Sequence, residues 1–384
     1  MYKVFRPMVV GWLFFEGGGD FVSREAPRGC FLVIEEGDRF PMMKTNDFLL
    51  ASLMVLIGLW TSDMVPLFAD EGGRLKTEPL FDDFDGETLN AKRWLVARTQ
   101  WGGKDRNGGV VPDNLYLEGG KLLVKGHGDR YTGPVKGVQR VGGKVTSITH
   151  GRRTGACLVT RECYASGRYE VRMKVPKEVG VCTGLWTFNY RRVDPNHPEY
   201  IANDGKGKSY ISNHEIDIEL PGRPGTKTVD IGYDWALLNT WVGERGMDMT
   251  ACPTKLPFEV NDGKFHTWRF DWHTGDPEGK GGKVVEPRVD FYLDGQLLGT
   301  ITTTVPVDAG QFWMGLWFPN QWAGEPDFGI ETLEIDWVRI TPFHEAGDRY
   351  AGSRAGPSQL LLGPEDWPKR LQPKKEGNSH KGRE

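Results

Sequence analysis

Short segments in the middle and C-terminal parts of the chain alternate apolar and polar residues at period two. Successive side chains of a β-strand point to opposite faces, so each segment would have one apolar and one polar face. Asp294-Gly295, which separates two of the segments, is a strong signal for a hairpin turn. With no convincing long amphipathic helix pattern, the chain is predicted to form an all-β jelly-roll β-sandwich of two antiparallel sheets. The predicted strands cover residues 169–175, 184–190, 214–220, 228–233, 267–272, 289–293, 296–301, 312–317 and 333–340.

The segment 214–220 reads His-Glu-Ile-Asp-Ile-Glu-Leu and places three acids on one face of a strand. Glu215, Asp217 and Glu219 share that face, while the apolar residues between them point into a core. Like charges at this spacing repel and raise one another's pKa, and a strand does not need that arrangement to fold. A solvent-facing strand of an antiparallel sheet has the same alternation, and clustered carboxylates also suit Ca²⁺ or Mg²⁺. A third interpretation is glycoside hydrolysis, which requires paired carboxylates facing one sugar.

Residues 42–69 have the pattern of a secretory signal peptide, with a basic start, an apolar run at 48–60 and small residues near the end. The apolar run is too short for a comfortable membrane span. We therefore expect a secreted or periplasmic protein with no stable membrane span once the signal is cleaved. Because a signal peptide should stand at the N-terminus, we hypothesise that translation starts at Met42 or Met43 and that residues 1–41 are an over-extended N-terminus.

The C-terminal residues 344–384 are rich in Gly, Pro, Ser, Lys and Arg. Such a composition buries too little apolar surface to order itself, so we predict a polar, basic and disordered tail. Its candidate docking residues are Leu360, Leu361, Leu362 and Trp367. The remaining stretch, 70–343, has the size of one all-β domain.

Charge and cysteine content narrow the choice of partners. The chain carries 48 Lys and Arg against 52 Asp and Glu, and this near balance does not suggest a nucleic-acid partner. The domain contains Cys157, Cys163, Cys182 and Cys252, whose spacing leaves their pairing open, although an exported chain permits disulfides. Without a Cys-x-x-Cys pair, a zinc site is not expected.

Tryptophan is abundant, with 14 residues in the chain. Most should fill the core of the sandwich. Trp101, Trp235, Trp241 and Trp322 instead stand beside Gly, Asn or Pro rather than in alternation, where a flat ring can serve as a platform for a sugar. We predict such a role for Trp317 and Trp322, and both interpretations stay open for Trp101 and Trp235. Core packing is predicted for Trp268, Trp272 and Trp337.

Taken together, these segments resemble glycoside hydrolase family 16, most closely its bacterial licheninase-like (β-1,3-1,4-glucanase) members, over most of 79–343. The family signature Glu-x-Asp-x-Glu fits Glu215, Asp217 and Glu219 without a gap. Five further segments are similar to family motifs: Ser166-Gly-Arg-Tyr-Glu-Val-Arg-Met-Lys, Phe265-His-Thr-Trp-Arg-Phe-Asp-Trp, Phe291-Tyr-Leu-Asp-Gly-Gln-Leu, Met314-Gly-Leu-Trp and Asp336-Trp-Val-Arg.

The resemblance implies a role for each acid. Glu215 would be the nucleophile, Asp217 the assisting acid and Glu219 the general acid/base of a retaining double displacement in a concave substrate cleft. Residues four apart on a strand have Cα atoms about 13 Å apart, whereas retaining enzymes hold the two carboxyl groups about 5–5.5 Å apart. The two Glu side chains must therefore lean toward each other over Asp217.

The resemblance also implies binding residues. Trp317 would line the cleft, Arg161 would donate hydrogen bonds to sugar hydroxyls, Asn114 would match a cleft asparagine, and Tyr233 would contact the sugar in the catalytic subsite. The family often carries a structural Ca²⁺ held partly by the Asp of its closing motif, which makes Asp336 the candidate metal ligand here. No redox or organic cofactor is implied.

Some positions depart from the licheninase pattern. Asn213 replaces an aromatic residue two positions before Glu215, Gly315 replaces an asparagine, and the residues up to Trp322 resemble those of xyloglucan transglycosylases.

The prediction is a secreted, monomeric endo-acting hydrolase that cleaves a polysaccharide, β-1,3/1,4-linked glucan. The first alternative is a transglycosylase on xyloglucan or another β-glucan. The second is a non-catalytic carbohydrate-binding protein, which would be marked by loss of one of the three acids.

Overall fold

The computed structural model describes most of the chain beyond residue 76. The described residues are 12–13, 23–24, 77–100, 107–141, 144–194, 210–224, 230–244, 248–279, 283–319, 322–350 and 360–373. Residues 12–13 and 23–24 pair as two short strands, β1 (Trp12–Leu13) and β2 (Ser23–Arg24). The predicted signal peptide at 42–69, nearly all of 1–41 and Trp101 lie outside the described residues.

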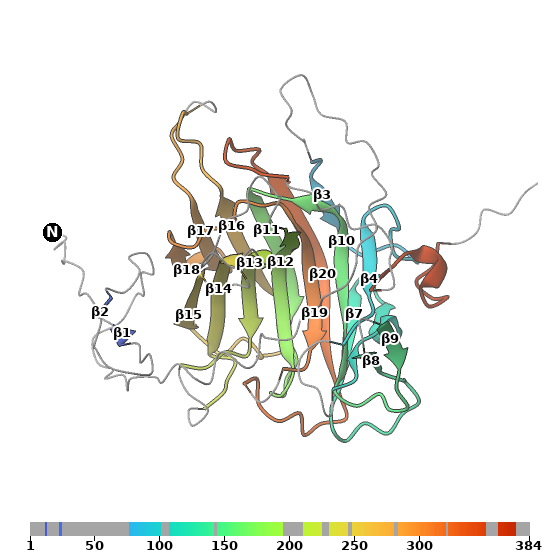
Figure 1. The fold of residues 1–384 in the computed structure, drawn as a ribbon. Coiled ribbons are helices and arrows are strands. Elements are labelled where there is room, and N and C mark those ends of the chain that lie inside the picture. Colours follow the sequence, from blue (N-terminus) through green and yellow to red (C-terminus); the bar gives the residue numbers. More distant parts are fainter. Residues whose placement is uncertain are drawn as a thin grey trace, which may run out of the picture.

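Two large antiparallel sheets form the body of the molecule, which is the predicted jelly-roll β-sandwich (Figure 1). We call the one that contains the three acids the acid sheet and the other the opposite sheet. The acid sheet runs in the order β21 (Leu361–Leu362), β4 (Trp94–Ala97), β10 (Thr154–Tyr164), β19 (Gly310–Trp317), β12 (Cys182–Val193), β13 (Tyr210–Leu220), β14 (Trp235–Glu244) and β15 (Asp248–Lys255).

The opposite sheet meets the acid sheet along β10, whose first residues pair with it. It runs in the order β6 (Leu115–Leu117), β7 (Leu122–His127), β20 (Ile330–Pro342), β11 (Gly167–Lys174), β16 (His266–His273), β17 (Arg288–Leu293) and β18 (Gln296–Ile301). The smaller elements are β3 (Leu80–Asp82) beside β20, β5 (Gly109–Val110) beside β10, the hairpin of β8 (Val138–Val141) and β9 (Lys144–Ser147), and the 3₁₀ turns η2 (Pro112–Asn114) and η3 (Pro364–Asp366).

The apolar faces of the two sheets pack on each other to form the core. Tyr169 of β11 stacks on Phe270 of β16 with 4.5 Å between ring centroids, and both rings contact Phe312 of β19 across the sandwich. Trp268 and Trp272 are buried as predicted. Trp337, on β20, is only partly buried and stacks with Arg339, so the core prediction for it is wrong.

All but one of the predicted segments overlap an observed strand. The Asp294-Gly295 hairpin is confirmed, because both residues adopt the positive φ angles of 49° and 82° that such a turn requires. The exception is 228–233, whose described part ends in a turn in which the Trp235 amide donates to the Gly232 carbonyl. The strand begins only after that turn, as β14.

The disorder predicted for 344–384 is wrong for residues 344–350, where Asp348 accepts hydrogen bonds from Ser166 and Thr274. It is also wrong for residues 360–373, which dock on the β4 edge (red in Figure 1) through the predicted residues Leu361, Leu362 and Trp367. Leu361 and Leu362 pair with β4, and the indole of Trp367 donates a 2.8 Å hydrogen bond to the Leu362 carbonyl. Trp367 and Leu371 are buried. Four apolar side chains within eleven residues bury enough surface to hold a segment whose overall composition is polar.

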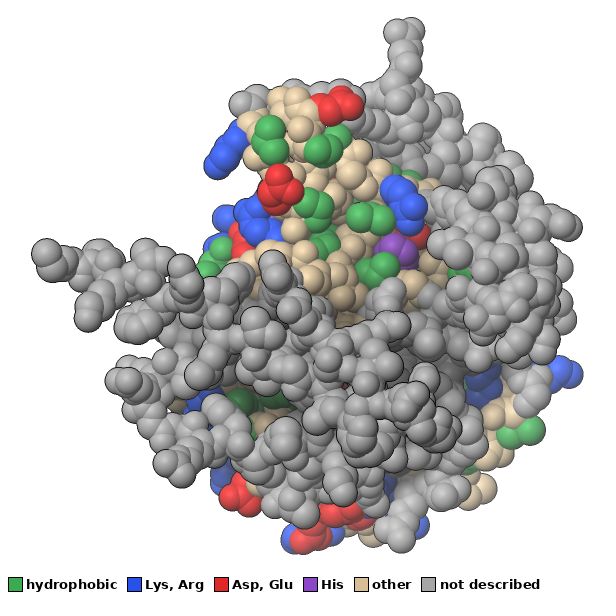
Figure 2. Space-filling view, turned by 60° about the vertical axis from the view of Figure 1, so that its left-hand side comes forward, with side chains coloured by type: hydrophobic (Ala, Val, Ile, Leu, Met, Phe, Trp, Pro, Cys, Tyr) green, Lys and Arg blue, Asp and Glu red, His purple; other side chains and the backbone are tan. Residues whose placement is uncertain are grey.

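The surface and the thiols add three facts. Cys157, Cys163 and Cys182 are buried, and no disulfide joins any two of them. Within the described ranges, no helix is both long and apolar enough to cross a membrane. On the face seen in Figure 2, the described acidic and basic side chains are interspersed rather than gathered into a patch of one sign.

Candidate active site

Strand β13 places the three acids on the outer face of the acid sheet. Ile216 and Ile218 fill the inner face and are buried in the core, as the alternation predicts. Strands β12 and β14 flank β13 on both sides in unbroken register over this stretch. Glu215 and Glu219 are partly exposed, whereas Asp217 between them is buried.

Glu215 and Asp217 each receive a hydrogen bond from a neutral side chain. The Asn213 amide donates to Glu215 Oε2 at 3.0 Å, and the Trp241 indole of β14 donates to Asp217 Oδ2 at 2.8 Å. The carboxyl groups of Glu215 and Asp217 are themselves hydrogen-bonded. Asp217 therefore connects a fixed indole donor on one side with Glu215 on the other.

Both oxygens of Glu219 have donors from the neighbouring strands. Asn239 of β14 donates its amide to Oε2 at 3.2 Å, and the Cys182 thiol of β12 lies 3.9 Å from Oε1. Burial raises the pKa of the Cys182 thiol, which keeps it protonated and able to donate. These contacts orient Glu219 without placing a positive charge beside it.

Burial raises the pKa of all three acids. The pKa of Glu215 rises to about 7 through desolvation, opposed by the hydrogen bonds from Asn213 and Asp217. The pKa of Glu219 rises to about 8 through desolvation and the charge of Glu215. Asp217 has its pKa raised well above the usual range by desolvation and then by the charges of both glutamates. All three carboxyl groups therefore hold a proton more tightly than an exposed carboxyl group does.

Aromatic rings continue the outer face beside the acids. A Cβ on Gly184, which pairs with Glu219, would lie 2.9 Å from the Trp186 ring and 3.4 Å from Trp317 Nε1, so only glycine leaves room for both rings. Trp317 is partly exposed and meets Trp322 edge to face, with 5.8 Å between centroids. The structure therefore brings the two predicted platform residues together, next to Glu219.

Trp235 lies farther along the same face. It precedes Leu237, the β14 residue paired with Glu219, by two positions and so shares the outer face of the sheet. Its ring is partly exposed and lies under the Lys255 ammonium, 5.3 Å from the centroid. The structure thus places Trp235 at the rim of the acid row rather than in the core.

Arg161 is on the acid sheet but is not brought to the acids. It lies in β10, in the irregular stretch between Val159 and Cys163, three strands away from β13. Neighbouring strands are about 4.8 Å apart, so the lateral separation is about 14 Å. The Arg161 guanidinium donates to the Ala91 carbonyl at 3.0 Å.

Asn114 and Tyr233 occupy packing positions rather than the predicted binding positions. Asn114 is fully buried in η2 and donates its amide to the Lys125 and Thr154 carbonyls at 3.0 and 2.9 Å. Tyr233 is buried in the core between the sheets, where its hydroxyl lies 3.4 Å from the Glu178 carbonyl. Both residues use their polar atoms to satisfy main-chain groups, and the structure does not bring them to the acids.

Asp336 does not fit a calcium site. Its carboxylate forms an ion pair with Arg172 of the neighbouring strand β11. The guanidinium occupies the carboxylate oxygen that would bind Ca²⁺ and places a positive charge beside it. Among the described residues no group of three or more His, Cys, Asp or Glu side chains could hold a metal ion.

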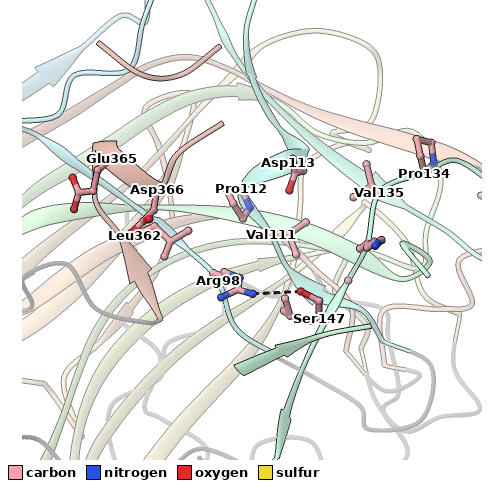
Figure 3. A pocket seen from close by; sticks show the side chains of 13 residues that line it. Arg98, Val111, Pro112, Asp113, Pro134, Val135, Ser147, Leu362, Glu365 and Asp366 are labelled. Carbon is pink, nitrogen blue, oxygen red and sulfur yellow. Dashed lines mark hydrogen bonds between the residues drawn. The ribbon is translucent and has the colours of Figure 1, made fainter. Parts of the chain in front are cut away.

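A cavity of about 960 Å³ lies at the β4 edge, away from the acids (Figure 3). Arg98, Pro112, Val135, Leu362 and Glu365 are among its lining residues, so it is formed where the docked C-terminal segment meets the β8–β9 hairpin region. None of the three acids lines it. The chemistry of the candidate site therefore belongs to the outer face of the acid sheet and not to this cavity.

The sequence gives no sign that Asn239 and Cys182 contact the acids, and it marks Trp241 only as a tryptophan outside the alternation. These three residues come from strands other than β13, and their contacts depend on a register that local alternation does not reveal. Asn213 was noted only as a departure from a family pattern, although a polar residue two positions before Glu215 shares its face of the strand. That period-two relation was the one available signal.

A two-sheet β-sandwich with a row of carboxyl groups on one outer face is typical of one class of protein, the carboxylate-based glycoside hydrolases. Comparison with known families identifies the family within this class. The family model described as Glycosyl hydrolases family 16 matches residues 131–339, more than half of the chain. The chain therefore belongs to glycosyl hydrolases family 16.

Curated relatives are bacterial. A β-glucanase of Paenibacillus macerans is 30% identical over 202 residues, which are 51% of this chain and 68% of that protein. A β-glucanase of Acetivibrio thermocellus is 28% identical over 188 residues, which are 48% of this chain and 44% of that protein. A β-glucanase of Bacillus subtilis is 28% identical over 185 residues, 47% of this chain and 60% of that protein. The chain thus spans about half the length of the last two relatives.

Solved structures show a weaker similarity. A prokaryotic β-1,3-1,4-glucanase (lichenase) derived from a mouse hindgut metagenome has a TM-score of 0.47 and 20% identity, covering 70% of this chain and 100% of that one. A Bacillus licheniformis β-glucanase has a TM-score of 0.46 and 21% identity, covering 70% of this chain and 99% of that one. The family assignment therefore rests on the sequence matches.

Proposed function

We propose that this protein is an exported, monomeric endo-acting β-glucanase that cleaves β-1,3/1,4-linked glucan with retention of configuration. The observation that carries the proposal is the row of three carboxyl groups on the outer face of β13, with neutral hydrogen-bond donors around them and the Trp317–Trp322 pair beside them. Burial raises the pKa of both Glu215 and Glu219 toward neutral pH, so the row can supply one carboxylate and one carboxylic acid on the same face. A retaining glycosidase requires that pair.

The proposed reaction begins with an attack of the Glu215 carboxylate on the anomeric carbon, while the Glu219 carboxylic acid protonates the departing glycosidic oxygen. This step forms a covalent glycosyl–Glu215 ester and leaves Glu219 ionised. Glu219 then takes a proton from a water molecule, whose oxygen attacks the anomeric carbon and releases Glu215. Asp217 keeps its proton and donates a hydrogen bond to Glu215, which helps Glu215 to leave as a carboxylate.

Substrate binding is proposed to use the aromatic residues beside the acids. Trp317 and Trp322 form an edge-to-face pair next to Glu219, and partly exposed rings of this kind offer flat apolar surface to sugar C–H groups. Trp235 is a further candidate at the rim. The β-glucanase relatives support a glucan as the polymer, and the signal-like segment at 42–69 supports export. The mechanism uses no metal ion.

Product analysis tests the proposal. The purified full-length protein is incubated with mixed-linkage glucan, laminarin, xyloglucan and agarose, and the products are sized while NMR follows the first anomer released. We expect short oligosaccharides from mixed-linkage glucan that first appear as the β-anomer. An initial α-anomer would exclude retention. Products that lengthen when a sugar acceptor is added would indicate a transglycosylase, and binding without cleavage would indicate a carbohydrate-binding protein.

A further inference from the structure

The segment 322–329, between β19 and β20, carries Trp322 and is here called the Trp322 segment. Trp322 itself has an aromatic neighbour in Trp317, which lies in strand β19. The contacts that hold the rest of the Trp322 segment therefore determine where the Trp322 ring lies relative to Trp317.

Main-chain hydrogen bonds fix the far half of the segment to the turn after β7. The Gly128 amide donates to the Gly329 carbonyl at 3.0 Å, and the Asp129 amide donates to the Pro326 carbonyl at 2.9 Å. Nearer to Trp322, the Gly180 amide donates to the Ala323 carbonyl at 2.6 Å. Between these attachments lies Glu325, which has no main-chain hydrogen bond to the β7 turn among those described.

The side chain of Arg153 links Glu325 to Asp129 in the same turn. Its guanidinium makes two parallel hydrogen bonds to Asp129, both 2.6 Å long, and its Nη2 also lies 2.8 Å from Glu325 Oε2. Only 9% of the Arg153 side chain is exposed, whereas 64% of the Glu325 side chain is. One buried cation thus holds two carboxylates from different segments and compensates the repulsion between their like charges.

A second arginine offers an internal comparison. Arg130, in the same turn, forms a paired interaction with Asp327 of the Trp322 segment, and the two side chains are 64% and 76% exposed. Exposed ion pairs of this kind contribute little because water screens them and ordering two long side chains costs entropy. The two bridges join the same two segments and differ in burial.

We propose that Arg153 is a positioning residue for substrate binding: through Glu325 and Asp129 it holds the Trp322 segment so that Trp322 stands against Trp317 as a sugar platform. The inference rests on the proposed function, since it assigns Arg153 a role in glucan binding. Arg153 has no contact with the three acids among its described interactions, so its effect acts through the segment and not on the chemical step.

The test compares Arg153→Gln with Arg153→Lys and with the matched control Arg130→Gln. We expect Arg153→Gln to raise KM for polymeric β-glucan about tenfold, the size of one lost aromatic contact, with kcat within about twofold, because the lost binding is distant from the reacting carbon. Arg153→Lys should recover part of the loss, since an ammonium cannot make the bidentate contact but keeps the charge. Arg130→Gln should leave both constants unchanged.

Amide hydrogen exchange of the same variants gives a readout that does not depend on turnover. Exchange in 322–329 should rise at least about threefold in Arg153→Gln and stay at the wild-type level in Arg130→Gln. Unchanged exchange in Arg153→Gln would overturn the positioning role even if no glucan proves to be a substrate. Raised exchange with an unchanged KM on a glucan that the wild type cleaves would also overturn it, and would leave the proposed function intact.

Discussion

Strands β11 and β13 have the same kind of sequence and different surroundings. Both alternate apolar residues that enter the core with charged residues on an outer face. On β11 the three basic residues have partners of opposite sign across the strands: Arg168 with Asp271, Arg172 with Asp336 and Lys174 with Glu334. Such pairing is what a solvated sheet face needs.

On β13 the outer face carries three carboxylates, and no described Lys or Arg forms an ion pair with them. Their partners are the neutral donors of Asn213, Asn239, Trp241 and Cys182. Neutral donors orient a carboxyl group and lower its pKa less than a cation would, so desolvation outweighs them and the pKa values stay high. The comparison shows that cross-strand partners, and not the alternation itself, separate an ordinary strand from a candidate active site.

The largest expected effect is on turnover. It is tested with one substitution to glutamine on each strand, which removes a charge and largely keeps the shape of the side chain. Glu215→Gln should lower turnover of β-glucan by at least about 10³-fold, because an amide cannot form the glycosyl ester. Arg168→Gln on β11, which breaks an ion pair on the opposite sheet, should leave turnover within about twofold. Initial rates on mixed-linkage glucan measure both, and retention of Glu215→Gln on a glucan affinity gel checks that it still folds and binds.

Near-wild-type turnover in Glu215→Gln would remove Glu215 as the nucleophile. A large loss in Arg168→Gln would instead show that the two strands are not separate in function. The two variants must therefore be measured under identical conditions.

The next effect concerns pH. The reaction needs Glu215 ionised and Glu219 protonated, so kcat/KM should rise with pH up to the Glu215 pKa near 7 and fall above the Glu219 pKa near 8. Glu219→Gln should abolish the alkaline limb and lower the rate on glucan about 10²–10⁴-fold. An aryl glycoside with a good leaving group, which needs no protonation, should lose far less in its first step. An alkaline limb that persists in Glu219→Gln would assign that limb to another group.

Local features could be predicted from the sequence. The acid row and most strands follow from period-two alternation, and the Asp294-Gly295 turn follows from the φ angles its residues tolerate. Those signals lie within a few neighbouring residues. The contacts of Trp241 and Asn239 do not, because β14 lies some twenty residues from the acids and only the strand register brings the two together.

Resemblance to a family predicts residue identities and says less about their environments. It assigns roles to the three acids, which lie together on one face of β13, and binding roles to Asn114 and Tyr233, which the structure buries against main-chain carbonyls. A residue type carried over from a motif says little about which way its side chain points when the surrounding loops differ. The polar composition of 344–384 wrongly predicts disorder for 360–373, whereas the apolar side chains of Leu361, Leu362 and Trp367 correctly predict where this segment docks.

The smallest expected effect is on thermal stability, which we compare between a substitution on β13 and one on β11. The folded-state pKa of Glu219 is raised from 4.5 to about 8, so the folded state binds the proton more tightly than the unfolded chain does. Stability therefore falls as pH rises from about 4.5 to about 8, where the buried carboxyl must ionise. Glu219→Gln removes that penalty and should raise Tm by about 2–5 °C at pH 9 while leaving it nearly unchanged at pH 4.5.

Arg172→Gln on β11 is the matched change. It removes a partly exposed ion pair with Asp336 and should lower Tm by only about 1–3 °C at pH 9. Thermal unfolding of both variants and the wild type at the two pH values measures the difference. A Tm gain in Glu219→Gln that is equal at pH 4.5 and pH 9 would mean that the buried charge of Glu219 is not its source, because only the ionised carboxyl carries the desolvation penalty that glutamine removes.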